Sequence, residues 1–439
     1  MSDRHGRLLR VLGLGFGLAV TIGNTIGAGI FRAPGEVASH LPDAWWFLAA
    51  WLVGGLFALI GALQIAELGT MLPRSGGQYV FSRHALGEYP GFIVGWSDWL
   101  STCGTAAAVS IVIAEFSAAL LPALADHLPV IAAAVAIVFA AAQFRGIREG
   151  RLVQNVTSSM KALAFLALIA AAFVLRGASP LDTFATIPGP AGLALAAAFM
   201  LALQGVIYTY DGWAAVVYFS EEVEDPGRNI PRSLIAGVLA ILAMYMLVNL
   251  AFLYVLPVTA IAGEPFVAGA VARALAGDAG ELGLRALTIV AMLSALNSNH
   301  LMASRVLLAM SRDGLVSERA SIVNAGGTPT VALLLSTAVA VLFIVLGRTF
   351  GQVITVLAFF FIANYTLSFV SLFVLRRREP GRPRPYRAWG YPWTTAAALI
   401  GSVVFLVGAV AGDTRNSLFA LVLLAASYPA YRWVRRRSA

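Results

Sequence analysis

Charged residues are scarce in this sequence and make up only 12% of its 439 residues. A water-soluble domain needs a far more polar surface than this. The composition is instead 59% hydrophobic, with a mean hydropathy of +0.82. Apolar runs of about 20 residues recur along the chain, and each is long enough to cross a bilayer core of roughly 30 Å. The sequence therefore excludes a soluble globular protein and predicts an all-α polytopic membrane protein.

Cysteine is almost absent. Cys103 is the only one and lies within an apolar run, which excludes an internal disulfide and a cysteine-rich metal site and argues against a disulfide-linked subunit. The five histidines have no metal-site spacing, and they are His5, His40, His84, His127 and His300. We see no nucleophile–base pair and no repeated pore filter. The sequence therefore predicts neither an enzyme nor a channel, and no cofactor or metal.

Lysine is as rare as cysteine, so the net charge of +8 comes from 29 arginines. They cluster in short segments between apolar runs, which is a topological signal and not that of a nucleic-acid-binding protein. With a cytoplasmic N-terminus, 23 arginines fall on the inner side and 5 on the outer side. The positive-inside rule thus predicts that both termini are cytoplasmic, in the cytoplasmic (inner) membrane of a bacterium.

The hydropathy pattern predicts twelve transmembrane helices. Their expected ranges are 11–38, 44–71, 90–121, 129–144, 153–175, 192–220, 233–256, 284–312, 329–347, 352–376, 393–411 and 417–434. The whole chain, 1–439, would form one transmembrane transporter domain.

Two of these helices carry polar interruptions. TIGNTIGAGIFRAPG, residues 21–35, breaks the first, and YTYDG, residues 208–212, breaks the sixth. Corresponding breaks five helices apart indicate an inverted repeat of 11–175 and 192–376, followed by two additional helices in 393–434. The freed N–H groups of such breaks suit a carboxylate and the freed carbonyls suit an ammonium. The alternative is that the glycines only let helices pack closely.

Several longer motifs resemble one family. IGAGIF (26–31), AELGTMLPRSGGQYVF (66–81), YTYDGWAAVVYFSEEVEDPGRNIPRSL (208–234), SRVLLAMSRDGLV (304–316) and RPYRAWGYP (384–392) are similar to motifs of the amino acid–polyamine–organocation superfamily, in the same order. The closest resemblance is to bacterial relatives of the L-amino-acid transporters. It implies the fold with twelve helices and a 5+5 inverted repeat, alternating access, and an amino acid bound at the centre of the membrane.

The resemblance also implies a substrate site. Its residues would be Thr25, Ile26, Gly27, Ala28, Gly29, Tyr208 and Asp211. The backbone of Ala28 and Gly29 would receive the substrate carboxylate, and the carbonyls of Thr25, Tyr208 and Asp211 would face its amino group. The family often has serine where this chain has Ala28, and a phenylalanine lid where it has Tyr208, so the substrate is not fixed by the motifs.

Lys161, the only lysine, lies in the helix predicted over 153–175. Ten residues from Arg151 place it about 15 Å into the membrane, where an unpaired ammonium costs several kcal/mol. It is expected to act as a cation-site substitute that fills the position of a sodium ion and braces the first helix near Gly27. Sodium-independent members of the family carry a lysine at a similar place, in some of them as a proton-coupling group. The alternative is that Lys161 snorkels to water along a polar helix face.

Other polar residues within the predicted spans are weaker candidates. Glu115 and Asn297 are the candidates for a cavity or gate residue. Glu115 and Asp98 are each as consistent with a hydrogen bond between helices or a gate contact as with a substrate ligand. The acidic cluster at 221–225 is expected to pair with Arg74 or Arg228, or to be a solvated loop.

The leading hypothesis is a sodium-independent secondary transporter of neutral L-amino acids that works as an exchanger or a proton symporter. The alternatives are a carrier of a cationic amino acid or polyamine and, more distantly, a membrane sensor without transport. The expected partners are the amino acid and the lipid bilayer, with no nucleic acid.

Overall fold

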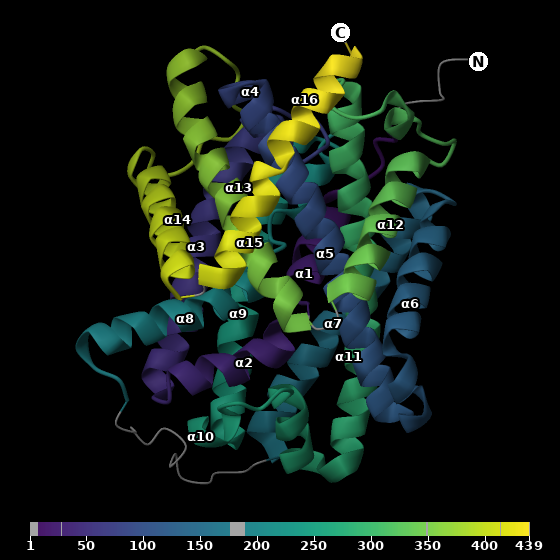
Figure 1. Ribbon diagram of the computed structural model, residues 1–439. Helices are drawn as coiled ribbons and strands as arrows, with labels where there is room; N and C mark the ends of the chain where they lie inside the picture. The colour runs from purple at the N-terminus through teal and green to yellow at the C-terminus, as the bar shows by residue number, and fades with distance from the viewer. Residues whose placement is uncertain (1–7, 28, 176–188, 348–349, 413, 439) are drawn as a thin grey trace.

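The computed structural model describes residues 8–27, 29–175, 189–347, 350–412 and 414–438, and almost all of them are helical (Figure 1). Within these ranges there is no β-strand, only the isolated bridges Leu12–Val223 and Val323–Pro329. The predicted all-α class is therefore confirmed.

The chain forms sixteen α-helices and three short 3₁₀ helices in the described ranges. The longer ones are α1 (Leu14–Thr25), α2 (Gly29–His40), α3 (Ala44–Met71), α4 (Gln78–Leu86), α5 (Glu88–Leu120), α6 (Leu128–Gln143), α7 (Ile147–Leu175), α8 (Gly192–Tyr210), α9 (Pro226–Val255), α11 (Val267–Arg312), α12 (Thr330–Gly347), α13 (Phe350–Arg378), α14 (Trp393–Gly412), α15 (Thr414–Ala425) and α16 (Ser427–Ser438). The short ones are η1 (Pro122–His127), η3 (Ala215–Phe219), α10 (Val258–Ile261) and η4 (Glu318–Ser321).

Ten helical segments of the described residues are long and apolar enough to cross a membrane, and the bent pair α1–α2 counts as an eleventh. The apolar part of α12, Thr330–Leu346, is shorter. A polytopic membrane protein is thus confirmed. The exact number of twelve spans, and the division into repeats 11–175 and 192–376 with extra helices in 393–434, stay predictions.

Both predicted interruptions are present in the structure. α1 ends at Thr25, α2 begins at Gly29, and the two helices are bent by 41°. α8 ends at Tyr210, Asp211 is extended, and Gly212 has a φ of +103°, which favours glycine. The chain then continues as η3 toward α9.

Several helix boundaries differ from the prediction, since α7 begins at Ile147 and α9 at Pro226, and the start of α11 differs most. The helix expected over 284–312 is part of α11, which begins at Val267. Its regular geometry is interrupted at Ala276 and at Gly277, where φ is +66°. The segment before this kink, 267–276, has Arg273 as its single charged residue but is too short to cross a membrane, so hydropathy alone does not join it to the helix that follows.

α5 and α11 pack against one another along the middle of the bundle, and α5 also contacts α12 and α13. The half-helix α1 lies against α7 and α9, while α2 lies against α8. α14 and α15 pack on one flank against α13 (Figure 1). The two interrupted helices are thus enclosed by the long, continuous ones.

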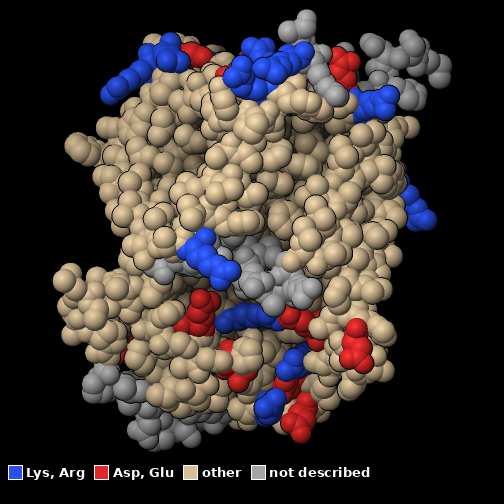
Figure 2. Space-filling model, in the orientation of Figure 1, with Lys and Arg blue, Asp and Glu red and all other residues tan. Residues whose placement is uncertain are grey.

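Segments predicted on the inner side gather at one end of the molecule. Glu221 accepts from Arg10 through its carbonyl and from Arg312 through its carboxylate. Arg74 pairs with Asp313 at 2.8 Å, so the pairing expected between Arg74 and the acidic cluster was wrong. Figure 2 shows basic side chains along this end, a mostly uncharged surface beside it, and a second group of both signs farther down. The side of the membrane that this end faces stays a prediction.

Candidate functional site

A small cavity lies where the two interrupted helices meet. Its volume is about 40 Å³, enough for roughly three water molecules. Its lining comes from the α1–α2 and α8–η3 breaks and from α4, α5, α11 and α13, and it is rich in hydroxyl and amide groups. The polar residues of the lining are Asn24, Thr25, Gln78, Asp98, Thr102, Thr105, Tyr208, Thr209, Asp211, Tyr218, Asn299 and Tyr365.

Most residues of the predicted substrate site line this cavity. Thr25, Gly27, Gly29, Tyr208 and Asp211 are all part of the wall. The Ile26 side chain is completely buried and is not part of the wall. Ala28 lies outside the described residues. The structure therefore brings five of the seven predicted residues to one cavity.

Two glycines let the breaks approach one another. A Cβ on Gly29 would lie 2.6 Å from Thr209 Oγ1 and 2.9 Å from Thr209 Cα. A Cβ on Gly212 would lie 2.7 Å from the Asn24 amide nitrogen. Side chains at either position would push the broken helices apart, so the site depends on glycine at both places.

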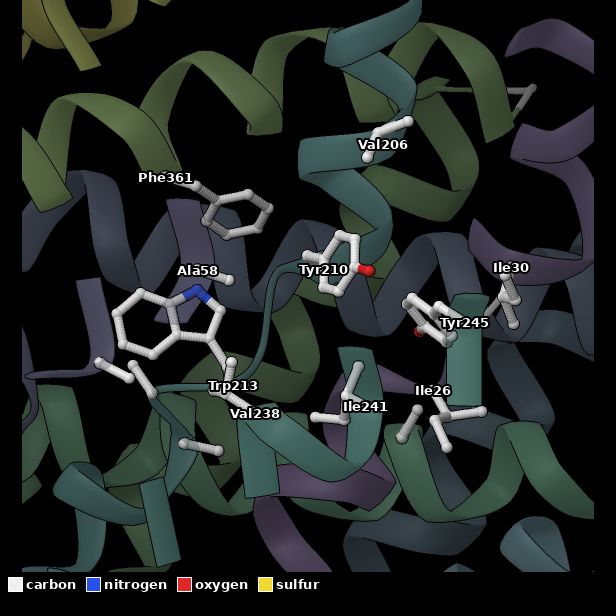
Figure 3. Close-up of a cluster of buried hydrophobic side chains, with 14 of the residues drawn as sticks. Ile26, Ile30, Ala58, Val206, Tyr210, Trp213, Val238, Ile241, Tyr245 and Phe361 are labelled. Carbon is white, nitrogen blue, oxygen red and sulfur yellow. The ribbon is translucent and has the colours of Figure 1, made fainter. Parts of the chain in front are cut away.

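Tyr245 of α9 joins the two breaks. Its hydroxyl lies 2.8 Å from the carbonyl oxygen of Thr25 and 3.1 Å from that of Thr209. The Tyr245 ring packs against Tyr210 at 4.9 Å, and Figure 3 shows these rings beside the apolar cluster behind the breaks. Sequence analysis did not select Tyr245. A tyrosine in the middle of an otherwise apolar span was the available signal.

Lys161 is 1% exposed, and its ammonium lies against the first break. Nζ donates to the carbonyl of Gly23 over 2.8 Å and to that of Ile26 over 2.5 Å. The helical partner of the Gly23 carbonyl would be the Gly27 N–H, which instead donates to Thr25. Lys161 therefore occupies carbonyls that the break leaves free, and it does not extend to the surface.

Each carboxylate of the cavity wall has a tyrosine partner. Asp211 accepts from the Tyr365 hydroxyl over 2.8 Å, and the Tyr365 ring stacks on Trp213 at 4.9 Å. Asp98 accepts from the Tyr218 hydroxyl, which lies 2.8 and 3.0 Å from its two oxygens. Sequence analysis did not single out either tyrosine, since both lie in aromatic-rich apolar runs.

Asn24 joins the first break to α11. Its side-chain oxygen accepts from Ser298 over 2.7 Å and from Asn299 over 3.1 Å. These residues were not selected as site residues, although the polar stretch SALNSNH at 294–300 was the signal.

The two residues expected as cavity or gate groups are not part of the cavity wall, and a gate role for either stays a prediction. Glu115 forms an ion pair with Arg32 of α2 and is not part of the cavity wall. Asn297 donates to the Gln154 side chain over 3.0 Å and accepts from Gln143. It ties α11 to α6 and α7 behind the cavity. The structure therefore does not bring Glu115 or Asn297 to the site.

The sequence is similar to known transporters along its whole length. The family model described as "Amino acid permease" matches residues 16–427. A serine/threonine exchanger, SteT of Bacillus subtilis, is 28% identical over 446 aligned positions that cover 100% of both chains. The human b(0,+)-type amino acid transporter 1 is 27% identical and covers 86% of this chain and 78% of its own. The mouse Asc-type amino acid transporter 1 is 27% identical and covers 87% of this chain and 73% of its own.

The order of motifs, the two interrupted helices and the cavity between them all agree with this similarity. The chain therefore belongs to the amino acid permease family, as a multi-pass membrane protein that resembles the bacterial L-amino-acid transporters.

Proposed function

We propose that the protein is a secondary active transporter that moves small neutral L-amino acids by alternating access. The observation that carries this proposal is the cavity between the two breaks, where helix ends converge on a small, polar space. Helix N-termini attract carboxylates and freed carbonyls attract ammonium groups, so a zwitterion is complementary to both ends. The similarity to a serine/threonine exchanger supports this substrate class.

The site residues take the roles expected from the family motifs. The backbone of Gly29, the first residue of α2, receives the substrate carboxylate, and the family motif implies the same role for Ala28. The carbonyls of Tyr208 and Asp211 face the substrate ammonium. The Thr25 carbonyl faces it as well, although this carbonyl already accepts a hydrogen bond from Tyr245. Thr102 and Thr105 line the same wall, and their hydroxyl groups, which donate to their own helix, could accept from a small polar side chain.

Transport is proposed to be independent of sodium. A sodium ion binds to several oxygens, and Lys161 Nζ already bonds to the carbonyls of Gly23 and Ile26. Ser294 of α11 lies 3.4 Å from the same Gly23 carbonyl, so the ammonium ties α7 to a point where α1 meets α11. The Lys161 ammonium would therefore stabilise this contact between helices in place of a bound sodium ion.

A cationic amino acid or polyamine is the second candidate substrate. Asp98 and Asp211 both line the cavity, whose described wall contains no lysine or arginine. The tyrosine donors of both carboxylates weigh against direct binding of a second ammonium.

The proposed location is a bacterial cytoplasmic membrane with both termini in the cytoplasm. The excess of arginine in alternate segments supports it. So do the contacts among those segments, such as Arg435 with Glu88 and Arg312 with Glu221.

The test is uptake of a labelled panel of L-amino acids into proteoliposomes that contain the purified protein. Internal amino acid, sodium and an inward proton gradient are varied separately. Sodium-insensitive uptake of serine, threonine or alanine is expected. Strict sodium dependence would overturn the proposed role of Lys161. Uptake of arginine or putrescine alone would replace the substrate class, and no uptake of any substrate would favour a sensor.

A further inference from the structure

Four carboxylates are buried in the described part of the chain, Glu67, Asp98, Glu222 and Glu281, and Asp98 is the one of them for which no ion pair is found. Glu67 pairs with Arg376 and Arg384, Glu222 pairs with Arg305, and Glu281 pairs with Arg273 and Arg285. Asp98 is 2% exposed, yet the structure gives its side chain only the Tyr218 hydroxyl as a donor. Asp98 lines the cavity together with Asp211, which accepts from Tyr365 and is less completely buried.

The surroundings of Asp98 contain acids and phenols. The titratable groups that face it are Tyr218 of η3, Asp211 of the second break and Tyr365 of α13. From α4 and α11 the cavity wall contributes Gln78 and Met302, which carry no charge. Each of these titratable neighbours is neutral when protonated and negative when ionised, so none of them can neutralise an ionised Asp98.

An ionised carboxylate in this position has a high energetic cost. Burying a charge without a partner costs several kcal/mol, and a second carboxylate in the same cavity adds repulsion. One phenol donor shared between two oxygens does not replace the lost hydration. Asp98 therefore requires a positive charge, and the described cavity wall offers none from the protein.

We propose that Asp98 is the proton-binding site of the transport cycle, an inference that rests on the proposed transport function. When the cavity is reached from the outer side, a carboxylate oxygen of Asp98 takes one proton from water. The same proton returns to water on the inner side, and no other covalent bond forms or breaks. The amino acid and the proton would thus move together.

The Asp98–Tyr218 contact provides a physical link between this proton and the inner closure of the cavity. The Tyr218 carbonyl accepts from the Gly76 N–H over 3.3 Å, and a Cβ on Gly77 would lie 2.4 Å from the Tyr218 ring. Tyr218 is thus held between the loop before α4 and Asp98 of α5. A hydrogen bond to an ionised carboxylate is roughly twice as strong as one between neutral groups. Protonation of Asp98 therefore weakens its hydrogen bond with Tyr218 and favours opening of the cavity toward the inner side.

The first test detects the proton itself. Infrared difference spectra of the purified, substrate-free protein across a pH titration should contain the carbonyl band of a protonated carboxyl group. This band should disappear in Asp98→Asn. The control is Asp313→Asn, which changes a carboxylate outside the cavity wall that accepts from Arg74 and Tyr79 and should leave the band in place. A band that persists in Asp98→Asn would overturn the proposal.

The second test measures coupling in proteoliposomes. A proton gradient of one pH unit can drive up to about tenfold accumulation if one proton moves with each substrate. We expect such accumulation for the wild-type protein. Asp98→Asn, which cannot release a proton, should lose the response of serine uptake to the proton gradient, whatever rate of exchange it keeps, whereas Asp313→Asn should keep that response. Accumulation that survives in Asp98→Asn, or wild-type exchange with no response to the gradient, would overturn the proposal.

The two tests separate the inference from the transport proposal. If the wild-type protein moves no amino acid, the transport function fails, and the infrared band still decides whether Asp98 binds a proton. If the protein carries arginine or putrescine and Asp98→Asn loses their binding, Asp98 is a ligand of the substrate cation and the proton proposal is wrong.

Discussion

Glu222 and Arg305 form a completely buried ion pair with two parallel hydrogen bonds of 3.0 Å. The pair connects the loop after η3 with α11. The carbonyl of Glu222 also accepts from the N–H groups of Val11 and Leu12, so the segment before α1 meets the same point. Two segments that lead into the interrupted helices are therefore tied to one continuous helix.

Replacing Arg305 with methionine should strongly destabilise the protein. The change leaves Glu222 buried without its cation, which costs about 3–5 kcal/mol for a pair of this kind. Thermal unfolding in detergent measures the effect. Arg312→Met is the matched control, because its pair with Glu221 is partly exposed and is worth about 0–1 kcal/mol. The further change Glu222→Leu should restore much of the stability lost in Arg305→Met. Equal losses in Arg305→Met and Arg312→Met would contradict this account.

Lys161→Met should abolish most transport while the protein remains folded. The methionine has a similar length but leaves the carbonyls of Gly23 and Ile26 without a donor, at about 1–3 kcal/mol for each unsatisfied group. We expect at least a tenfold loss of exchange, since about 1.4 kcal/mol corresponds to tenfold. Serine exchange in proteoliposomes and gel filtration of the purified variant provide the measurements. Thr157→Val on the same helix is the control, because its hydroxyl bonds only to the backbone of its own helix. Full exchange by Lys161→Met would rule out a required ammonium.

The fold was largely predictable because lipid imposes a simple rule on the sequence. Backbone groups in hydrocarbon must bond within a helix, so apolar length and interrupting residues can be read directly. Gly212 and the glycines near Gly29 therefore marked the breaks correctly. The start of α11 at Val267 was missed, since the ten residues before the kink are too few to cross a membrane and are followed by the charged stretch GDAGELGLR.

The site was only partly predictable, because its polar partners come from helices far apart in sequence. Asp98 was found as an unusual acid, but its contact with Tyr218 depends on how η3 packs against α5. Glu115 has the same intramembrane character, yet it pairs with Arg32 away from the cavity. Sequence alone identifies a costly buried charge and does not say which partner satisfies it.

Gly212→Ala should impair the site more than an ordinary glycine substitution. At φ +103° an alanine is strained, and its Cβ would lie 2.7 Å from the Asn24 side chain. Backbone strain of this kind costs about 1–3 kcal/mol, so exchange should fall about tenfold or more. Gly283→Ala in α11 is the control, because nothing lies within 4 Å of its added Cβ. An alanine at this helical position should leave the free energy of unfolding unchanged or raise it by up to about 1 kcal/mol. Equal activity of the two variants would show that the close approach is not needed.

Tyr365→Phe should weaken substrate binding through Asp211. The change removes the 2.8 Å hydrogen bond to the Asp211 carboxylate and leaves the ring stacked on Trp213. Hydrogen bonds to charged groups contribute about 1.5–3 kcal/mol, so we expect a rise of about tenfold or more in the serine concentration for half-maximal exchange. Tyr210→Phe is a close control, because the described structure gives the buried Tyr210 hydroxyl no hydrogen-bond partner. That variant loses no hydrogen bond and should exchange serine like the wild-type protein. If both variants weakened exchange equally, the effect would come from ring packing at the second break and not from the Asp211 contact.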